Sequence, residues 1–276
     1  MAEIGKFNTL KVVKVVDFGV YLDGGNNVEI LLPARYLAHP MHIGDEIEVF
    51  IYTDSEDRLI ATTEIPYIKV GEFAQLRVKQ TNRVGAFMDW GLQKDLLVPF
   101  SEQRSKMREG GEYIVYAYLD DNTKRIVASS KIDKFVGNTL PEYKKGEEVN
   151  ALVWQNTEIG YKVVVNNLHH GMVYHNELFR DLSVGEVVKA YVKNVRTDGK
   201  IDLTLSDKAQ SRIGTLAEDI YQWLSMRGGE SGLCDKSSPE EIKKIFQCSK
   251  KDFKKAIGQL FKEHRIVLNA DGMKIV

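Results

Sequence analysis

One pattern occurs three times in the first three quarters of the chain, and this repeat constrains the fold more than any other feature. Each copy opens on a glycine and has a second glycine at a fixed distance further along. Later landmarks keep this register to within one residue. A register that holds at so many positions indicates one structural unit repeated three times. The glycine pairs are Gly5 and Gly19, Gly71 and Gly85, and Gly146 and Gly160.

Within each copy, apolar residues alternate with polar ones as they do in β-strands. In the first copy, the run at 12–22 is expected to form one long strand that bends at Gly19, because a glycine inside a strand often marks a bulge or a barrel corner. A short strand that ends at Pro33 follows, and further strands are expected at 46–52 and 58–63. Five short strands in about 60 residues predict a small closed barrel of the OB type.

After residue 206 the apolar spacing changes to that of helices. Thr215, Ser238 and Ser249 each have an acid three residues later, which is typical of a helix start. A hairpin is expected within 265–276. Three helices followed by a two-stranded ribbon predict a winged helix. The third helix is expected to bury Phe253, Ile257, Leu260 and Phe261.

The predicted architecture is mainly β with a small α+β end. It consists of three tandem five-stranded OB barrels followed by a winged-helix domain. The barrels are expected at 1–65, 66–132 and 146–208, with a linker at 133–145 and the winged helix at 209–276.

Short motifs within the repeat are more specific. The third copy reads GMVYHNEL over residues 171–178 and IDLTLS over 201–206. The second reads VGAFM over 84–88 and RIVASS over 125–130. These motifs resemble the ribosomal S1 type of RNA-binding OB domain.

Three S1-type barrels followed by a winged helix resemble, over the whole chain, the conserved virulence factor B family, also called YitL-type proteins. The resemblance implies a bacterial cytoplasmic protein that binds single-stranded RNA and acts in post-transcriptional control of gene expression.

Barrels of this type bind RNA by stacking bases on exposed aromatic rings beside a basic groove. The resemblance places the stacking residues at Phe18, Tyr21, Phe87 and Tyr174, and Trp90 is an additional candidate nearby. The alternative is that these rings belong to the barrel cores. That alternative is evenly balanced for Phe18 and less favoured for Tyr21 and Phe87. Cations of the first strands could contact phosphate, and these are Lys14, Lys79 and Arg83.

The copies depart from the family pattern in different ways. The family histidine is replaced by Pro33, Pro99 and Tyr174, and Lys162 and Val84 stand where aromatic residues are usual. We therefore expect the three barrels to bind RNA unequally.

The expected third helix of the winged helix carries Lys250, Lys251, Lys254 and Lys255. These lysines could contact RNA or DNA, or they could form an ordinary solvated face. A winged helix can also dock on a protein. The remaining alternatives are therefore a protein-docking adaptor and an accessory subunit of an RNA-degrading complex.

Other features exclude several classes of protein. The start of the chain does not have the pattern of a signal peptide, and no apolar run is long enough for a membrane span. Only two cysteines occur, which favours a cytoplasmic location. His169, His170 and His175 lack an obvious fourth metal ligand. We expect a monomer with no catalytic residues, metal or cofactor.

Overall fold

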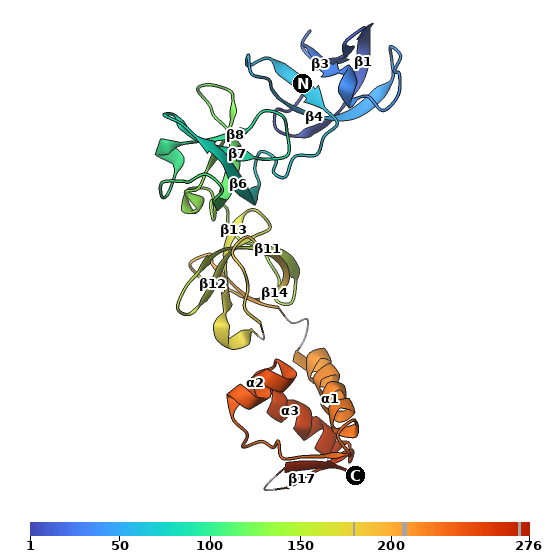
Figure 1. Cartoon of the computed structure of the whole chain (residues 1–276), viewed down its shortest axis with the longest axis vertical. Coiled ribbons are helices and arrows are strands. Elements are labelled where there is room, and N and C mark those ends of the chain that lie inside the picture. Colours follow the sequence, from blue (N-terminus) through green and yellow to red (C-terminus); the bar gives the residue numbers. More distant parts are fainter. Residues whose placement is uncertain (179, 206–208, 270–271) are drawn as a thin grey trace. The chain divides into compact units, whose positions relative to one another are not determined.

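The computed structural model describes residues 1–178, 180–205, 209–269 and 272–276. The chain forms two compact units, Met1–Val136 and Gly137–Val276. The fold class predicted from the repeat is confirmed, because three closed five-stranded barrels precede a small helical domain (Figure 1).

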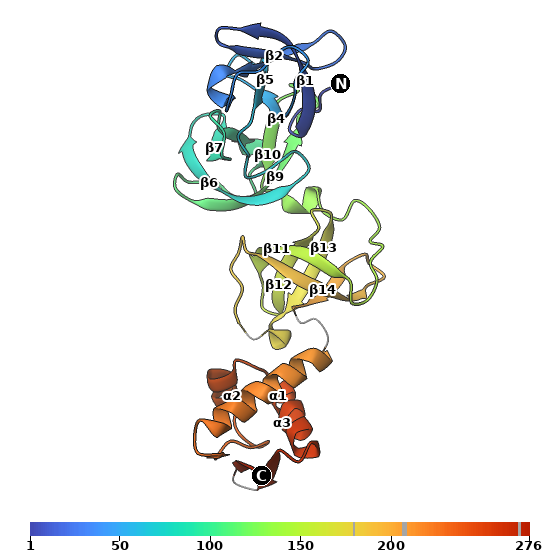
Figure 2. The same ribbon diagram turned by 90° about the vertical axis from the view of Figure 1, so that its right-hand side faces the viewer.

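The first unit contains two barrels (Figure 2). In barrel one the strands follow each other around the wall in the order β1-β2-β3-β5-β4, and in barrel two the order is β10-β8-β7-β6-β9. The bounds in barrel one are β1 Phe7–Val16, β2 Gly19–Asp23, β3 Glu29–Pro33, η1 Ala34–Tyr36, β4 Glu46–Thr53 and β5 Leu59–Thr62. Those in barrel two are β6 Phe73–Thr81, β7 Gly85–Asp89, β8 Leu96–Pro99, η2 Phe100–Glu102, β9 Glu112–Leu119, β10 Ile126–Ser129 and η3 Ile132–Lys134.

The core of barrel two extends onto Phe50 and Tyr52 of barrel one, whose own core is a separate cluster, and we call this contact between the two barrels the seam. Phe50 and Tyr52 of barrel one pack edge-on against Trp90, with ring centroids 5.9 and 6.3 Å apart. Ile68 and Leu92 are buried in the same cluster. The large buried aromatic area holds the two barrels together, since each such ring buries about 150–250 Å².

The second unit contains barrel three, with the strand order β11-β12-β13-β15-β14. Valines supply much of its core, as expected for strands buried on one face. The bounds are β11 Glu148–Asn156, β12 Gly160–Val165, β13 His169–Tyr174, η4 His175–Glu177, β14 Val187–Val195 and β15 Ile201–Thr204.

The same unit contains the winged helix, in which three helices precede a hairpin. A short strand that the sequence did not predict, β16, joins the hairpin in the order β16-β18-β17. The Ser238 side chain accepts a hydrogen bond from the Glu241 N–H and completes a capping box, as predicted. The bounds are α1 Ala209–Ser225, β16 Glu230–Ser231, α2 Pro239–Phe246, α3 Lys250–Lys262, β17 Ile266–Asn269 and β18 Gly272–Ile275.

Two predictions about these helices are wrong. The first helix does not begin at Thr215, since α1 already includes Ala209 and continues through Gly214. The first helix is therefore longer than the capping pattern indicated. In the third helix, Phe261 is 50% exposed, whereas Phe253, Ile257 and Leu260 are buried as predicted. Phe253, Ile257 and Leu260 lie on the buried face of the helix, and Phe261, one residue after Leu260, falls outside that face.

The expected long first strand is also wrong. It is two antiparallel strands, β1 and β2, joined by a turn at Asp17 and Phe18. Gly19 in barrel one and Gly160 in barrel three each begin the second strand of their barrel, and each pairs with a residue of the third strand. A Cβ atom at Gly19 would lie 2.2 Å from the Leu32 carbonyl oxygen, and one at Gly160 would lie 2.3 Å from that of Val173. Glycine is required there because two backbones approach closely.

Candidate nucleic-acid interface

A bulge in the first strand decides which side chains reach the outer face of each barrel. The pairing shifts after Val12 in β1, after Val78 in β6 and after Val153 in β11. A bulge breaks the alternation of inward and outward residues. Lys14 and Lys79 are therefore both exposed, although Lys14 lies two residues after the buried Val12 and Lys79 lies directly after the buried Val78.

In barrel one, residues paired across neighbouring strands form a row on the outer face of the barrel. Two residues of this row, Lys14 and Tyr21, were predicted to contact RNA. Lys14 pairs with Tyr21, which pairs with Leu31. The Lys14 ammonium lies 5.5 Å from the centroid of the Tyr21 ring. Phe18 is 58% exposed and meets Tyr21 edge-on at 6.4 Å. The structure thus brings Phe18, Tyr21 and Lys14 together on one surface.

In barrel two, the equivalent row borders a groove of about 390 Å³. Gln80 pairs with Phe87 and Phe87 with Leu97. The half-buried Phe87 ring and the Leu97 side chain form an apolar wall, and charged groups surround it. The groove is lined by Ser55, Gln80, Val84, Phe87, Lys94, Asp95, Leu97, Arg125, Ile126 and Val127.

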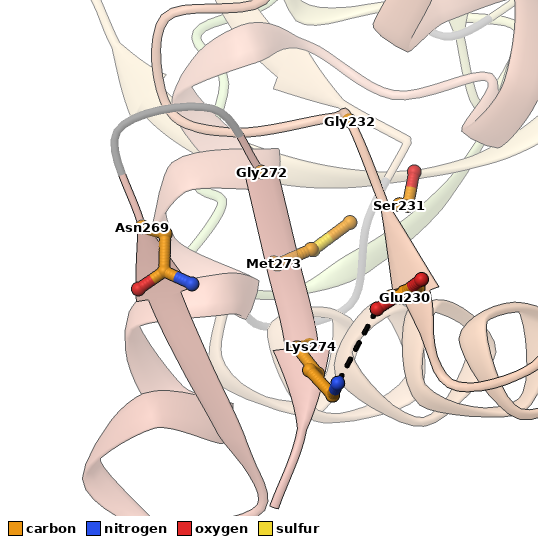
Figure 3. A pocket seen from close by; sticks show the side chains of 7 residues that line it. All are labelled: Glu230, Ser231, Gly232, Asn269, Gly272, Met273 and Lys274. Carbon is orange, nitrogen blue, oxygen red and sulfur yellow. Dashed lines mark ion pairs between the residues drawn. The ribbon is translucent and has the colours of Figure 1, made fainter.

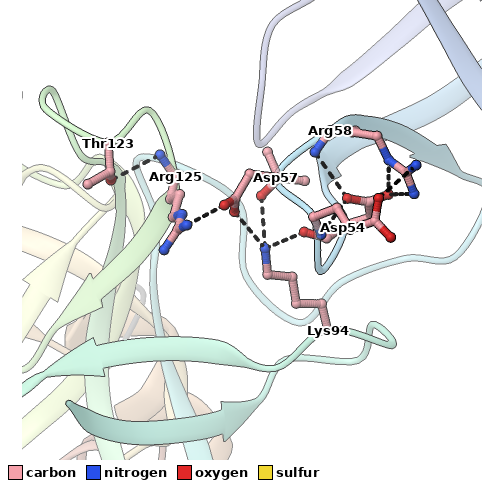
Figure 4. A network of polar contacts seen from close by, with 8 residues as sticks. Asp54, Asp57, Arg58, Lys94, Thr123 and Arg125 are labelled. Carbon is pink, nitrogen blue, oxygen red and sulfur yellow. Dashed lines mark hydrogen bonds and ion pairs between the residues drawn. The ribbon is translucent and has the colours of Figure 1, made fainter.

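Acidic side chains hold the cations around this groove (Figure 4). Arg125 donates a hydrogen bond to Asp57 of barrel one, and Lys94 lies 3.5 Å from the same carboxylate. The bond from Arg125, with the charges of both cations, holds the pKa of Asp57 below its usual range. Lys79 pairs with Asp95 at 2.8 Å, and this hydrogen bond raises the Lys79 pKa. The groove is therefore lined by paired charges, which weakens its attraction for a distant polyanion.

Barrel three has a different surface. Lys162 occupies the position of Tyr21 and Phe87 in the row, and its ammonium lies 5.4 Å from the centroid of the Trp154 ring. Tyr174 lies at the end of β13, where its hydroxyl donates to Asp202 at 3.2 Å and accepts from Arg196. Burial and the Asp202 charge raise the Tyr174 pKa. The Tyr174 ring is thus held by an ion pair and is half-buried.

Trp90 does not belong to the exposed surface, and its prediction as a stacking residue is corrected. The side chain is 3% exposed and packs in the seam against Phe50 and Tyr52. Along β7, Phe87 faces outward while Ala86 and Met88 face inward, and Trp90 follows the inward set. Because side chains alternate between the two faces of a strand, the odd spacing between Phe87 and Trp90 already indicated that the two rings lie on opposite faces.

Arg83 is exposed in the turn between β6 and β7, and within the described ranges it makes no ion pair. Phe100, in η2, was missed by the sequence predictions although it is 46% exposed. Its N–H donates to the carbonyl oxygen of Val84, which lines the groove. An aromatic residue directly after Pro99 was the available signal.

The predicted lysines of the winged helix lie in the first half of α3. Lys251 and Lys255 are exposed, and so is Lys254, which pairs with Asp235 at 3.7 Å. Lys250 is half-buried and donates to the carbonyl oxygen of Lys236. Three of the four lysines therefore face outward, and Lys250 helps to fix the start of the helix.

The hairpin of the winged helix borders a second hollow of about 450 Å³ (Figure 3). Lys274 pairs with Glu230 at 3.3 Å across β18 and β16. Ser231, Asn269 and Met273 complete much of the lining. Since the lysine in this lining is already paired, the hollow favours no anionic ligand.

The histidines weighed as metal ligands have separate structural roles. His169 is buried, and its ring nitrogens bond to the hydroxyls of Thr139 at 2.9 Å and Tyr143 at 3.1 Å. His175 bonds to the Thr157 carbonyl oxygen. Within the described ranges, no three residues of the metal-binding types gather around one point. The helices in those ranges are all too short or too polar to cross a membrane.

An S1 domain model matches residues 4–64 and again 70–131, and a CvfB-like winged helix domain model matches residues 218–275. Domains of these two types point to nucleic-acid binding.

Relatives match over nearly the full length. "Uncharacterized protein YitL" of Bacillus subtilis is 28% identical over 95% of this chain and 90% of its own length. "Conserved virulence factor B" of Staphylococcus epidermidis is 26% identical over 99% of this chain and 94% of its own length. A solved Streptococcus pneumoniae structure, described as a multidomain protein with nucleic acid binding domains, is 23% identical with a TM-score of 0.43 and covers 99% of this chain and 98% of its own. With S1 domains in its first half and a CvfB-like winged helix domain at its end, the chain is similar over nearly its full length to proteins named conserved virulence factor B and YitL.

Proposed function

We propose that this protein binds single-stranded RNA in the cytoplasm, as a monomer without catalytic activity, and acts in post-transcriptional control of gene expression. The observation that carries the proposal is the groove of barrel two. It presents the Phe87 ring beside the cations of Lys94 and Arg125. This is the combination that a stacked base and its phosphate require.

Stacking, rather than charge, is expected to supply most of the affinity. A base stacked on an aromatic ring contributes about 1–3 kcal/mol. The two cations that line the groove, Lys94 and Arg125, are already paired with Asp57. Two phosphate contacts, from Lys94 and Arg125, correspond to a log–log salt slope of about −1.4 for a single strand.

The barrels are expected to contribute in a definite order. Barrel two has the groove and barrel one has an open aromatic pair, Phe18 and Tyr21. Barrel three has Lys162 where the other two carry a ring, and its Tyr174 hydroxyl is engaged by Arg196 and Asp202. We infer that barrels one and two bind bases and that barrel three contacts phosphate.

Filter-binding titrations with single-stranded RNA, duplex RNA and single-stranded DNA over a salt series test this proposal. We expect Phe87→Ala to weaken binding of single-stranded RNA about tenfold, since one stacked base is lost. Tyr67→Ala is a matched control, because Tyr67 is an exposed ring outside the groove. Equal affinities of Phe87→Ala and the unmodified protein would overturn the assignment.

A second candidate function concerns the winged helix, which could dock on DNA or on a partner protein. The observation that favours it is the outer face of α3, where Lys251, Lys254 and Lys255 are followed by the half-exposed Phe261. Replacing all three lysines by glutamine should leave RNA binding by the barrels intact if this face serves another partner.

A further inference from the structure

We propose that barrels one and two bind one continuous RNA strand, whose phosphates follow a track of three cations across the seam. The track consists of Arg58, Lys94 and Arg125. It connects the half-buried Tyr21 ring of barrel one with the half-buried Phe87 ring of barrel two. The inference rests on the proposed function and adds to it that the two barrels form a single site.

At the barrel-one end, the turn between β4 and β5 fixes Arg58. The Asp54 carboxylate accepts hydrogen bonds from the backbone N–H groups of Glu56 and Arg58, at 2.9 and 3.0 Å. The same carboxylate accepts from the Arg58 guanidinium at 2.9 Å. The hydrogen bond from Arg58 to Asp54 and the charge of that carboxylate, then the charge of Glu56, raise the Arg58 pKa. Arg58 directly precedes β5, in which Ile60 pairs with Leu31, and Leu31 in turn pairs with Tyr21, so that Arg58 lies beside the end of the strand row that holds Tyr21.

The middle of the track is a lysine of barrel two that reaches onto barrel one. The Lys94 ammonium donates to the Asp54 carbonyl oxygen at 2.6 Å and to the Thr53 hydroxyl at 3.3 Å. Its own backbone is also fixed, because its carbonyl oxygen accepts from the Trp90 indole N–H at 2.5 Å. Lys94 therefore lies at a defined position between the two barrels.

The barrel-two end of the track is Arg125, which donates a hydrogen bond to Asp57. Asp57 lies between Arg125 and Lys94 and contacts both (Figure 4). Arg125 and Phe87 line the same groove, and so does Ser55 of the barrel-one turn. The turn that holds Arg58 is therefore also a wall of the Phe87 groove. A strand that leaves this groove along Arg125 and Lys94 arrives at Arg58 and then at Tyr21.

The seam makes this track a rigid one. Phe50 and Tyr52 pack directly against Trp90, so that no flexible linker separates the two barrels at this point. Two aromatic platforms that are held in place bind a strand without the entropic cost of ordering two domains. We expect a strand long enough to reach both rings to bind more tightly than one that reaches a single ring.

The test is a length series of fluorescein-labelled oligouridylates, of about 4 and about 16 nucleotides, with the full chain. We expect the long strand to bind at least about tenfold more tightly than the short one, after correction for the number of binding registers. Arg58→Gln should lower the affinity for the long strand about fivefold and change that for the short strand, which binds in the Phe87 groove, less than about twofold. Tyr21→Ala should weaken binding of the long strand more than that of the short strand. Lys106→Gln, which removes the same charge from an exposed position outside the groove, is the matched control.

The outcomes separate the two proposals. Equal affinity for both lengths, with Phe87→Ala still weakening each, overturns the continuous track and leaves the RNA-binding groove in place. A Tyr21→Ala variant that weakens short and long strands alike also overturns the track, because the barrels would then bind independently. If Phe87→Ala affects neither length, the proposed function itself fails.

Discussion

Trp90 donates its indole N–H to the backbone carbonyl oxygen of Lys94 at 2.5 Å, within the same connection between β7 and β8. One residue of the seam thereby positions the lysine that reaches from barrel two to barrel one. The tryptophan acts on the candidate interface from inside the protein, although it was predicted to act from the surface.

Trp90→Phe keeps most of the buried ring and removes this hydrogen bond. We expect the first unit to lose about 1 kcal/mol of unfolding free energy, because a hydrogen bond to a partly buried carbonyl is lost. Affinity for long RNA should fall as well, since Lys94 is no longer fixed. Urea titrations followed by circular dichroism and the length series together measure both effects. Unchanged affinity for long RNA would show that the position of Lys94 does not depend on Trp90.

Gly160→Ala and Gly258→Ala should have opposite effects. A Cβ atom at Gly160 would lie 2.3 Å from the Val173 carbonyl oxygen, so that we expect a loss of more than about 1 kcal/mol. At Gly258, in α3, nothing lies within 4 Å of the added carbon. Alanine there should stabilise the helix by up to about 1 kcal/mol. Thermal melts of the two variants check the signs, and a destabilised Gly258→Ala would contradict the expectation.

Stability should depend on the protonation of His169. Burial lowers the pKa of this histidine in the folded chain, although contacts with Thr139 and Leu140 oppose the shift. The unfolded-state pKa is about 6.5. The neutral ring therefore contributes its full stabilisation above about pH 6.5, and this is lost as the pH falls toward the lower folded-state pKa. Melting temperatures at about pH 7 and pH 5 should differ less in His169→Gln than in the unmodified protein.

Ser238→Ala should destabilise the winged helix by about 1 kcal/mol, because the capping box at the start of α2 loses one of its two hydrogen bonds. Ser238→Asp keeps a side-chain acceptor at this position and serves as the control. Helical circular dichroism during heating distinguishes the variants. Identical melting of Ser238→Ala and the unmodified chain would mean that tertiary packing alone holds this helix end.

The barrels could be predicted from the repeat because register and strand order are properties of each copy alone. The face of Lys14 could not be predicted, since the bulge between β1 and β2 is invisible to a pattern of alternation. Trp90 was misplaced although its alternation with Phe87 was available. Asp57 and Lys94 were missed for another reason, because they meet only when two barrels pack together.

The seam also changes what counts as a module in this chain. Cutting the chain between residues 65 and 66 would leave Phe50 and Tyr52 bare on one fragment and Trp90 bare on the other. Exposed aromatic clusters of this kind promote aggregation. The first two copies of the repeat therefore form a single folding unit. A truncated or recombined protein should therefore keep residues 1–136 together, even though the sequence repeats within this range.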